Sequence, residues 1–568
     1  MKTRIWRADV AQGKVTIEDV PSGWSKMGGR GMIPRILLDQ GSPDSDPLGS
    51  RNKLIWAPGL LVGHKVSSCD RISIGAKSPL THGIKESNAG GSTGLKLAYL
   101  GIKALILEGF PPDDAWRLLH LSVEGGRFEP ADELTGMGVY QASEKILDRY
   151  GPKVGLALIG PGGERLLTGA GIQNLDKDNQ PTRIAARGGL GAVMGSKRIK
   201  AIVIDAAGGR PPALADPELF EAGKQHYTKQ LLAHPQTAVY AEYGTAGMTL
   251  MCDGLGGLPT RNFSAGIFEG AENLSGEAMR DLLLARGGES QTTHACMAGC
   301  VIRCSNRFAG PDGKQIVSPL EYETIGLVGA NLGIDNLDDV ARINWQLNDL
   351  GLDTIEIGAA LGVAAEAWLM AFGDGSRALA LVDEIRQGTP LGRMLGCGAA
   401  TTARVLGVRR APVVKGQAIS AYDPRAIKGT GVTYATSPQG ADHTAGNTIR
   451  AKVDLLDPRG KAELSRNAQI NMAGYDTLGV CLFGSFGFAK APGAIRDLLN
   501  GRYGWEMGED ALEQLGRETL KLERAFNHAA GFMAADDRIP EWMTLEPLPP
   551  HDTVFDVPNA ELDGVFPW

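Results

Sequence analysis

Three cysteines stand at four-residue intervals in the stretch CMAGCVIRC, at Cys296, Cys300 and Cys304, in a chain with only 7 cysteines. On a helix these positions would share one face, so one reading is a row of small core residues. The other reading is thiolate ligation, because iron–sulfur clusters take four cysteines, commonly three close in sequence and one remote. Zinc or the cluster of a radical enzyme can use similar spacings. The scarcity of cysteine elsewhere favours ligation.

A remote fourth ligand would identify the metal group. The candidates are Cys69, Cys252, Cys397 and Cys481. Cys481 lies in YDTLGVCLF, where an acidic residue and a glycine turn precede the cysteine. The odd number of cysteines and their low density suit a reducing compartment better than a disulfide framework.

The elements that position these residues differ between the first third and the rest. Short β runs, bounded by Gly, Pro or Asp, dominate up to about residue 207: RISIGA, KALILEG, KVGLALIG and KAIVIDA. Helical periods follow, and DNLDDVARINWQLNDLGLD is the clearest, with Asp or Asn to cap its start and Gly351 to end it. TIEIGAALGVAAEAWLMAF predicts a buried helix, and DALEQLGRETLKLERAFNHAAG predicts a late one.

Breaks in composition predict three domains. The composition shifts to Pro, Gly and Ala in AAGGRPPALADPE, near residue 209. A second interruption of the helical pattern is GVRRAPVVKG, near residue 410. We expect a β-rich domain over 1–208, a helical domain with the cysteine triplet over 209–410, and a mainly helical domain over 411–568 that carries the fourth cysteine.

Charge and hydropathy narrow the class of protein. A net charge of −7 and a pI near 5.8 disfavour nucleic acid as a partner. The start, MKTRIWRADVAQGK, has no apolar signal region or twin arginine, and no apolar run reaches membrane-spanning length. We expect a cytoplasmic protein.

Several separate motifs, from GGRGMIPRILLDQ to DTLGVC at 476–481, agree in order and spacing with one family. The chain resembles the tungsten-dependent aldehyde:ferredoxin oxidoreductases over most of its length. The resemblance implies an α+β fold, with a β-rich pterin-binding domain followed by two largely helical domains and the cofactor between them. It implies a tungsten bis-pyranopterin with a bridging magnesium, and one [4Fe–4S] cluster held by Cys296, Cys300, Cys304 and Cys481. The family's first cysteine spacing is one residue shorter.

The resemblance also assigns the first pterin to two glycine-rich regions. In RISIGAKSPLTHGIKESNAGGSTG, Arg71 would lie by the pterin phosphates, and Asn88, Gly90 and Gly91 would bring backbone close to the magnesium. A guanidinium suits a phosphate through paired donors, and glycines remove side chains that would block the backbone. In TRIAARGGLGAVMGSK either Arg183 or Arg187 would reach the phosphate, and we favour Arg187.

For the second pterin the family uses two related turns, which here read NDLGLD (348–353) and DTLGVC (476–481). Carboxylates suit a pterin because its ring edge offers several N–H donors. The predicted contacts are Asn348, Leu352, Asp353, Asp476 and Val480. Asn348 replaces an expected aspartate, and Val480 replaces an expected leucine. Asp353 has a second reading as a helix cap.

Two places match the family's catalytic segments. LEYETIG offers Glu321 and Glu323, between which the sequence does not choose, and GADHTAGNT offers His443. The Glu-x-x-His iron site that joins some family members is replaced by RINW (342–345), so a homo- or hetero-oligomer would need another interface.

The function implied by the resemblance is oxidation of an aldehyde to a carboxylic acid with water. Electrons would leave through the cluster to ferredoxin or a partner iron–sulfur subunit. Molybdenum could stand in place of tungsten. The alternatives are a tungsten subunit that reduces an aromatic acyl-CoA, for which Cys252 or Cys397 could supply a further metal ligand, and an inactive scaffold or electron-transfer subunit.

Overall fold

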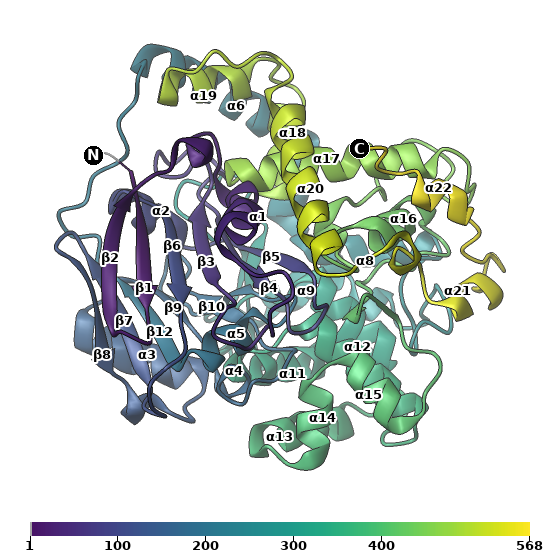
Figure 1. Cartoon of the computed structure of the whole chain (residues 1–568). Helices are drawn as coiled ribbons and strands as arrows, with labels where there is room; N and C mark the ends of the chain where they lie inside the picture. The colour runs from purple at the N-terminus through teal and green to yellow at the C-terminus, as the bar shows by residue number, and fades with distance from the viewer. Residues whose placement is uncertain (1–2) are drawn as a thin grey trace.

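The computed structural model describes residues 3–568. A β-rich part, purple to blue in Figure 1, lies against a larger helical part. No helix formed by residues 3–568 is both long and apolar enough to span a membrane.

Two mixed six-stranded sheets form the β-rich part, and Figure 1 shows their strands side by side. The first has the order β2-β1-β6-β3-β4-β5 and the second has the order β11-β10-β9-β12-β7-β8. In each sheet one pair is parallel, β1 with β6 and β7 with β12, and the other pairs are antiparallel. The strands are β1 (Arg4–Asp9), β2 (Lys14–Asp19), β3 (Leu54–Pro58), β4 (Ile72–Lys77), β5 (Ile84–Ala89), β6 (Ile102–Glu108), β7 (Arg117–Ser122), β8 (Gly125–Pro130), β9 (Gly155–Leu158), β10 (Ile172–Asn174), β11 (Arg183–Ala185) and β12 (Ile199–Ile204).

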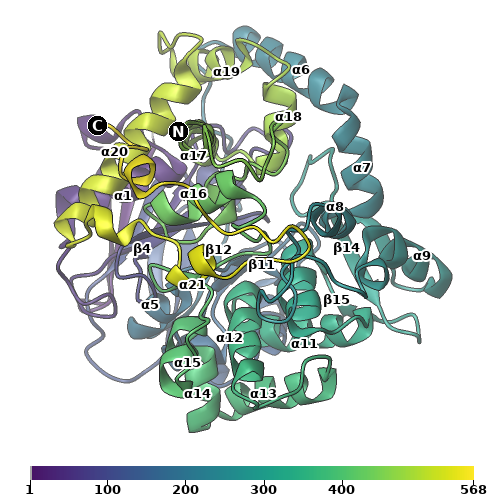
Figure 2. The same cartoon turned by 90° about the vertical axis from the view of Figure 1, so that its right-hand side faces the viewer.

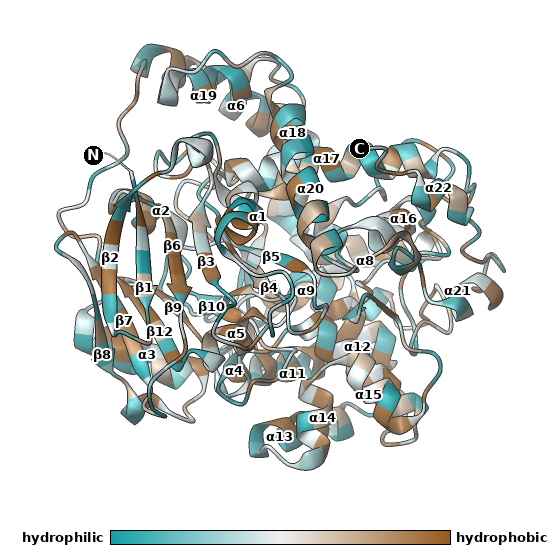
Figure 3. Ribbon diagram, viewed as in Figure 1, coloured by the Kyte–Doolittle hydropathy of each residue, from teal (hydrophilic) through white to brown (hydrophobic). Residues whose placement is uncertain are grey.

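The two sheets share one apolar core, which explains why strands such as β3, β4 and β12 are buried along their whole length. Strands covered on both faces read as continuous apolar runs rather than alternating ones. Figure 3 shows brown, apolar strands in this region. The helices of this part are α1 (Gly29–Gln40), α2 (Thr93–Tyr99), α3 (Val139–Tyr150), α4 (Pro161–Glu164) and α5 (Leu190–Ser196).

The helical part carries a small three-stranded sheet and a two-stranded one. Its strands are β13 (Gln291–His294), β14 (Ser305–Ala309), β15 (Gln315–Val317), β16 (Val413–Val414) and β17 (Gln417–Ala418). Its helices are α6 (Pro217–Ala233), α7 (Pro235–Tyr243), α8 (Met248–Gly254), α9 (Gly276–Arg286), α10 (Tyr322–Thr324), α11 (Leu337–Leu350), α12 (Thr354–Glu366), α13 (Gly375–Gln387), α14 (Pro390–Gly396), α15 (Ala399–Leu406), α16 (Lys428–Thr436), α17 (Lys461–Leu478), α18 (Ser485–Phe488), α19 (Ala494–Tyr503), α20 (Ala511–Ala529), α21 (Glu541–Leu545) and α22 (Asn559–Asp563). In Figure 2 the early helix α6 lies beside the late helix α19.

This architecture confirms the predicted fold class. The predicted helix of the middle third is α11, which Asn336 caps by accepting hydrogen bonds from the amides of Asp338 and Asp339. Gly351 ends it in the left-handed region at φ 70°. The helix α12 follows and is buried almost throughout, as its apolar sequence predicts.

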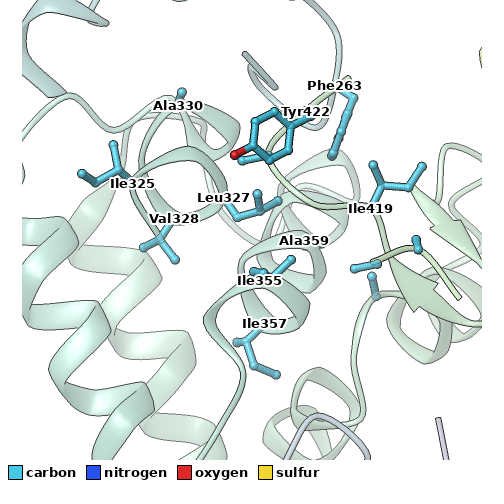
Figure 4. Packing of buried hydrophobic residues seen from close by; sticks show 14 of the residues in the cluster. Phe263, Ile325, Leu327, Val328, Ala330, Ile355, Ile357, Ala359, Ile419 and Tyr422 are labelled. Carbon is cyan, nitrogen blue, oxygen red and sulfur yellow. The ribbon is translucent and has the colours of Figure 1, made fainter. Parts of the chain in front are cut away.

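One apolar core extends across residue 410 in the helical part. Ile355 and Ala359 of α12 pack near Ile419 and Tyr422, which come from the last third of the chain (Figure 4). The chain between β12 and α6, residues 205–216, forms neither helix nor strand. The domain limits at 208 and 410 stay predictions.

Candidate functional site

A cavity of about 340 Å³ lies where the β-rich and helical parts meet. Eleven of its lining residues are among those singled out in the sequence: Arg71, Gly90, Arg183, Cys296, Cys304, Glu321, Glu323, Asn348, Asp353, His443 and Cys481. Seven predicted site residues are outside the lining: Asn88, Gly91, Arg187, Cys300, Leu352, Asp476 and Val480. We call this space the cofactor cavity.

The cysteine triplet lies in an irregular loop between β13 and β14, not on a helix. The reading of a helical stripe of core residues is therefore wrong. Burial raises the pKa of the Cys296 thiol to about 12, and the nearby Cys300 and Cys481 add to this effect while Arg183 and Arg71 oppose it. Burial likewise raises the pKa of Cys304 and Cys481, and the neighbouring cysteines add to it. Four thiols from two distant segments thus lie close enough to interact.

Arg71 and Gly90 face each other across the antiparallel pair β4 and β5. The guanidinium of Arg71 donates to the side chain of Asn88 and, at 3.2 Å, to its carbonyl oxygen. Gly90 packs against the loop that carries the cysteine triplet, because a Cβ on Gly90 would lie 3.1 Å from the Sγ of Cys296. Gly91 has a packing role, since a Cβ would lie 2.3 Å from the carbonyl oxygen of Leu175 and its φ is 102°.

Of the two arginines in the second glycine-rich region, Arg183 faces the cavity. Its Nε is buried and has no hydrogen-bond partner among residues 3–568, while its terminal nitrogen donates to the Oγ of Ser305 at 2.8 Å. Arg187 is saturated by protein groups: it donates to the Ser420 hydroxyl at 2.9 Å, to two backbone carbonyls, and to Asp353 at 3.3 Å. This geometry favours Arg183 for the phosphate contact, in contrast to the sequence, which favours Arg187.

The turn between α11 and α12 places Asn348 and Asp353 at the cavity wall. One carboxylate oxygen of Asp353 caps α12 by accepting from the amide of Ile355 at 2.9 Å, and the other faces Arg187. Asp353 is therefore both the helix cap and a cavity residue. Leu352 is fully buried beneath the turn. Burial raises the pKa of Asp353, although Arg187 opposes this effect.

The second turn ends α17 and leads directly to Cys481. Gly479 is left-handed at φ 81°, and its carbonyl oxygen accepts from the amide of Arg71 at 3.1 Å. The Cys481 amide donates to the carbonyl oxygen of Ser68 at 2.7 Å, so the turn is tied to the loop that precedes β4. Val480 is fully buried in the core beside this turn. Asp476 pairs with Arg30 at 3.2 Å, and burial raises its pKa to about 6.

Glu323 and His443 meet at the edge of the cofactor cavity. The Nε2 atom of His443 lies 3.2 Å from Oε1 of Glu323, without the alignment of a hydrogen bond. The other carboxylate oxygen of Glu323 accepts from the amide of Ala421 at 2.9 Å. Glu323 lies within α10, which continues into the buried π-helical segment Ile325–Gly329, and that segment packs on α12 (Figure 4). This packing fixes the Glu323 backbone.

Glu321 points to a different partner. Its carboxylate accepts from the hydroxyl of Thr245 and lies 3.8 Å from Arg183. Burial raises the pKa of both Glu321 and Glu323. The two glutamates therefore divide between the arginine side and the histidine side of the cavity.

A buried ion pair beside His443 was not found from the sequence. The ammonium of Lys85 lies 2.6 Å from Asp442, and Lys85 is fully buried. Asp442 also caps the short 3₁₀ turn His443–Ala445 by accepting from the amide of Thr444 at 3.0 Å. Lys85 and Arg187 hold the pKa of Asp442 far below its usual range against the effect of burial. The strand β5 reads IKESNA, so Lys85 opens a run of four polar residues and no apolar alternation marks it as buried.

A second cavity of about 350 Å³ adjoins the first. The two share Thr245, Glu321, Glu323, His443 and Phe483, so these residues form a common wall. We call the second space the outer chamber. Neither Cys252 nor Cys397 lines either space, so the structure gives no support to a further cysteine ligand.

The residues around the cofactor cavity fit an anionic, metal-containing group. Arg183 carries a buried donor without a partner, Gly90 leaves room beside Cys296, and four thiols converge. Among residues 3–568, no three His, Cys, Asp or Glu side chains are close enough to hold a single metal ion. A lone metal would therefore need donors from a cofactor, whereas an iron–sulfur cluster bridges wider gaps between thiols.

Comparison with known proteins agrees with this geometry. Residues 5–206 match the N-terminal domain of aldehyde ferredoxin oxidoreductase, and residues 222–563 match its domains 2 and 3. The chain belongs to the aldehyde ferredoxin oxidoreductase family. The tungsten-containing aldehyde ferredoxin oxidoreductases of Thermococcus kodakarensis and Pyrococcus furiosus are each 31% identical to it, over 96% of this chain and 92% of theirs.

Two further matches to this aldehyde ferredoxin oxidoreductase family member carry the names of other enzymes. The WOR-like subunit of an aliphatic sulfonate oxidoreductase from Pyrococcus furiosus is 25% identical over 94% of this chain and 87% of its own. The active-site complex of a benzoyl coenzyme A reductase, solved with a dienoyl-CoA, superposes with a TM-score of 0.78 at 20% identity, over 94% of this chain and 90% of that one. This last likeness shows the shared fold.

Proposed function

We propose that this enzyme oxidises an aldehyde with water to a carboxylic acid, two protons and two electrons. The contact between Glu323 and His443, 3.2 Å apart in the wall between the cofactor cavity and the outer chamber, carries the proposal. An acid–base pair at such a border can meet a substrate that enters from the outer chamber. The aldehyde-oxidising relatives, at 31% identity, support this reaction over the others.

The residues that would hold the cofactors are those of the cofactor cavity. Cys296, Cys300, Cys304 and Cys481 would ligate one [4Fe–4S] cluster. Arg71, Arg183, Asn348 and Asp353 would bind a bis-pyranopterin, the arginines through its phosphates and the other two through ring N–H groups. When bound, the tungsten of this cofactor would take up the two electrons, and the cluster would pass them on singly.

His443 would orient the aldehyde oxygen. Its Nδ1 lies 3.0 Å from the hydroxyl of Ser420, which already accepts a hydrogen bond from Arg187. The Ser420 hydroxyl can therefore donate a hydrogen bond to Nδ1. Because Nδ1 is then an acceptor, the single N–H of the neutral ring is on Nε2. That Nε2–H can donate to the carbonyl oxygen and stabilise its developing negative charge.

Glu323 would act as the general base. Its Oε1 is buried and has no hydrogen-bond partner among residues 3–568, so a lone pair is available to take a proton from water. Glu321 instead faces Arg183, 3.8 Å from its Oε1, and accepts from the Thr245 hydroxyl, so it lies away from His443. We therefore assign the base to Glu323 and a supporting role beside Arg183 to Glu321.

The electrons need an acceptor outside the chain, for which we propose ferredoxin or a partner iron–sulfur subunit in the cytoplasm. The 7 cysteines leave no second set for an internal relay once four bind the cluster. The aldehyde ferredoxin oxidoreductase relatives support ferredoxin.

The test is aldehyde-dependent reduction of a viologen dye by Glu323→Gln, Glu321→Gln and His443→Ala, with iron and tungsten measured in each variant. We expect kcat to fall by roughly 10²–10⁴ for Glu323→Gln and by a comparable factor for His443→Ala, with metals retained. Glu321→Gln should lose less than about tenfold. Near wild-type rates in metal-replete Glu323→Gln, with Glu321→Gln inactive, would reverse the assignment.

A further inference from the structure

The outer chamber is large enough for a ring-bearing substrate. Its volume is about 350 Å³, within the range of about 300–1,000 Å³ that small-molecule pockets have. At its inner end lie the residues shared with the cofactor cavity, including Glu323 and His443. The chamber is therefore the space in which the part of the aldehyde away from the carbonyl must lie.

Tyrosine and phenylalanine side chains form much of the wall of this chamber. Tyr240 and Phe483 lie with ring centroids 4.2 Å apart, and Phe486 lies 6.0 Å from each of them. Tyr322 and Tyr422 form a second pair with centroids 5.4 Å apart. Aromatic rings pack favourably at centroid separations of about 4.5–7 Å, so a planar ring suits this space better than a short alkyl chain.

Arg450 stands at the mouth of the chamber and is its only exposed lining residue. It makes no ion pair with any residue in 3–568, which sets it apart from most arginines near the site. One terminal nitrogen donates to the hydroxyl of Tyr240 at 3.0 Å and lies 3.2 Å from the sulfur of Met248. These contacts hold the guanidinium over Tyr240, 5.6 Å from the ring centroid.

We propose that the substrate is an aryl aldehyde with an anionic group on the ring, opposite the carbonyl. The ring would lie between the aromatic walls, and Arg450 would pair with the anionic group at the mouth. An arginine held in place and free of a carboxylate partner can bind an anion through paired N–H donors. This inference rests on the proposed aldehyde oxidation and adds its substrate class.

The test compares 4-formylbenzoate with 4-formylbenzamide, which has nearly the same shape without the charge, in viologen reduction by the metal-replete holoenzyme. We expect wild-type kcat/KM to be about tenfold higher for the benzoate, the factor that a charge-assisted hydrogen bond gives. Arg450→Met should remove that preference, because it should lower kcat/KM much more for 4-formylbenzoate than for 4-formylbenzamide. Arg450→Lys should retain most of the preference, since it keeps the charge.

Arg404→Met is the matched control, because Arg404 is an exposed arginine on α15 outside the chamber lining. It should leave both substrates unchanged. Equal kcat/KM for the two aldehydes in wild type, or an equal loss for both in Arg450→Met, would overturn the inference.

Binding separates this inference from the proposed reaction. Terephthalate should bind the wild-type holoenzyme more tightly than benzoate in calorimetry, and Arg450→Met should abolish the difference. If no aldehyde is turned over but this difference is seen, the proposed reaction fails and the anion site stands. If aldehydes are oxidised but neither the rate nor the binding depends on charge, the anion site fails alone.

Discussion

Glu323 has an environment that makes activity depend on pH. Burial raises the pKa of its carboxyl above the ordinary 4.5, Asp442 raises it further, and His443, Arg187 and the Ala421 amide lower it in part. A general base must be deprotonated, so kcat should rise with pH as Glu323 loses its proton above pH 4.5.

The measurement is the pH profile of viologen reduction in wild type and Glu323→Gln. The acid limb should be present in the wild type, with its midpoint above pH 4.5, and should vanish from the residual activity of the variant. The same limb in both enzymes would assign it to another group.

Cys481 is predicted to be the fourth cluster ligand. Cys481→Ala should lose bound iron and the visible absorption of the cluster, because three thiolates leave one iron without its protein ligand. Cys252→Ala is the control, since Cys252 is fully buried outside both cavities. A full cluster in Cys481→Ala together with iron loss in Cys252→Ala would contradict the ligand set.

At the level of single residues, sequence reasoning found the cavity but not the orientation of every side chain. Spacing and resemblance led to Cys296, Cys481, Asp353 and His443, all of which line it. The choice between Arg183 and Arg187 depends on which one the protein already satisfies, and the carbonyls that hold Arg187 come from residues more than 200 positions away. No local pattern contains that information.

Among the elements, the turn at the end of α17 depends on two glycines in contact. A Cβ on Gly59 would lie 2.1 Å from the amide nitrogen of Gly479, a backbone atom that cannot yield without moving the turn. Because Cys481 follows Gly479 by two residues, Gly59→Ala should displace this cysteine and reduce cluster iron below four per chain.

The control for Gly59→Ala is Gly460→Ala at the other end of the same helix. Gly460 is also left-handed, at φ 72°, but a Cβ there would meet nothing within 4 Å. It should cost about 1 kcal/mol of stability from backbone strain and keep the full iron content. Iron analysis and the visible spectrum of both variants test whether the contact between Gly59 and Gly479 positions Cys481.

Local patterns predicted most of the elements themselves. The apolar runs RISIGA, KALILEG, KVGLALIG and KAIVIDA are the strands β4, β6, β9 and β12, and Asn336 and Gly351 bound α11 as capping rules require. The order of strands in the two mixed sheets was not predicted, because pairing joins residues far apart in sequence. The sequence also did not decide the conformation of the cysteine triplet, because four-residue spacing fits a helix as well as the irregular loop that is present.

For the molecule as a whole, a buried charge cluster ties the β-rich part to the last helices. Arg30 of α1 donates to Glu523 of α20 at 2.8 and 2.9 Å and to Asp476 of α17 at 3.2 Å. Removing Glu523 breaks the paired hydrogen bonds of Arg30 and leaves Asp476 as its remaining hydrogen-bonded partner, and breaking a buried ion pair costs up to about 3–5 kcal/mol. Glu523→Gln should therefore lower the thermal unfolding midpoint of the loaded enzyme.

Glu513→Gln on the same helix provides the comparison. Glu513 pairs with Arg517 at 2.6 Å on the exposed face of α20, and such surface pairs contribute about 0–1 kcal/mol. Its unfolding midpoint should stay close to that of the wild type. A similarly small shift of the unfolding midpoint in both variants would show that the buried charge cluster does not stabilise the contact between the two parts.

The walls of the cofactor cavity come from Arg71 at one extreme and Phe483 at the other. Such a cavity does not exist on a ribosome until more than four-fifths of the 568 residues have been made. The complete site therefore forms only after the segment around Phe483 has been made and has docked against the segment around Arg71, so a bound cofactor joins the two ends of the translated chain.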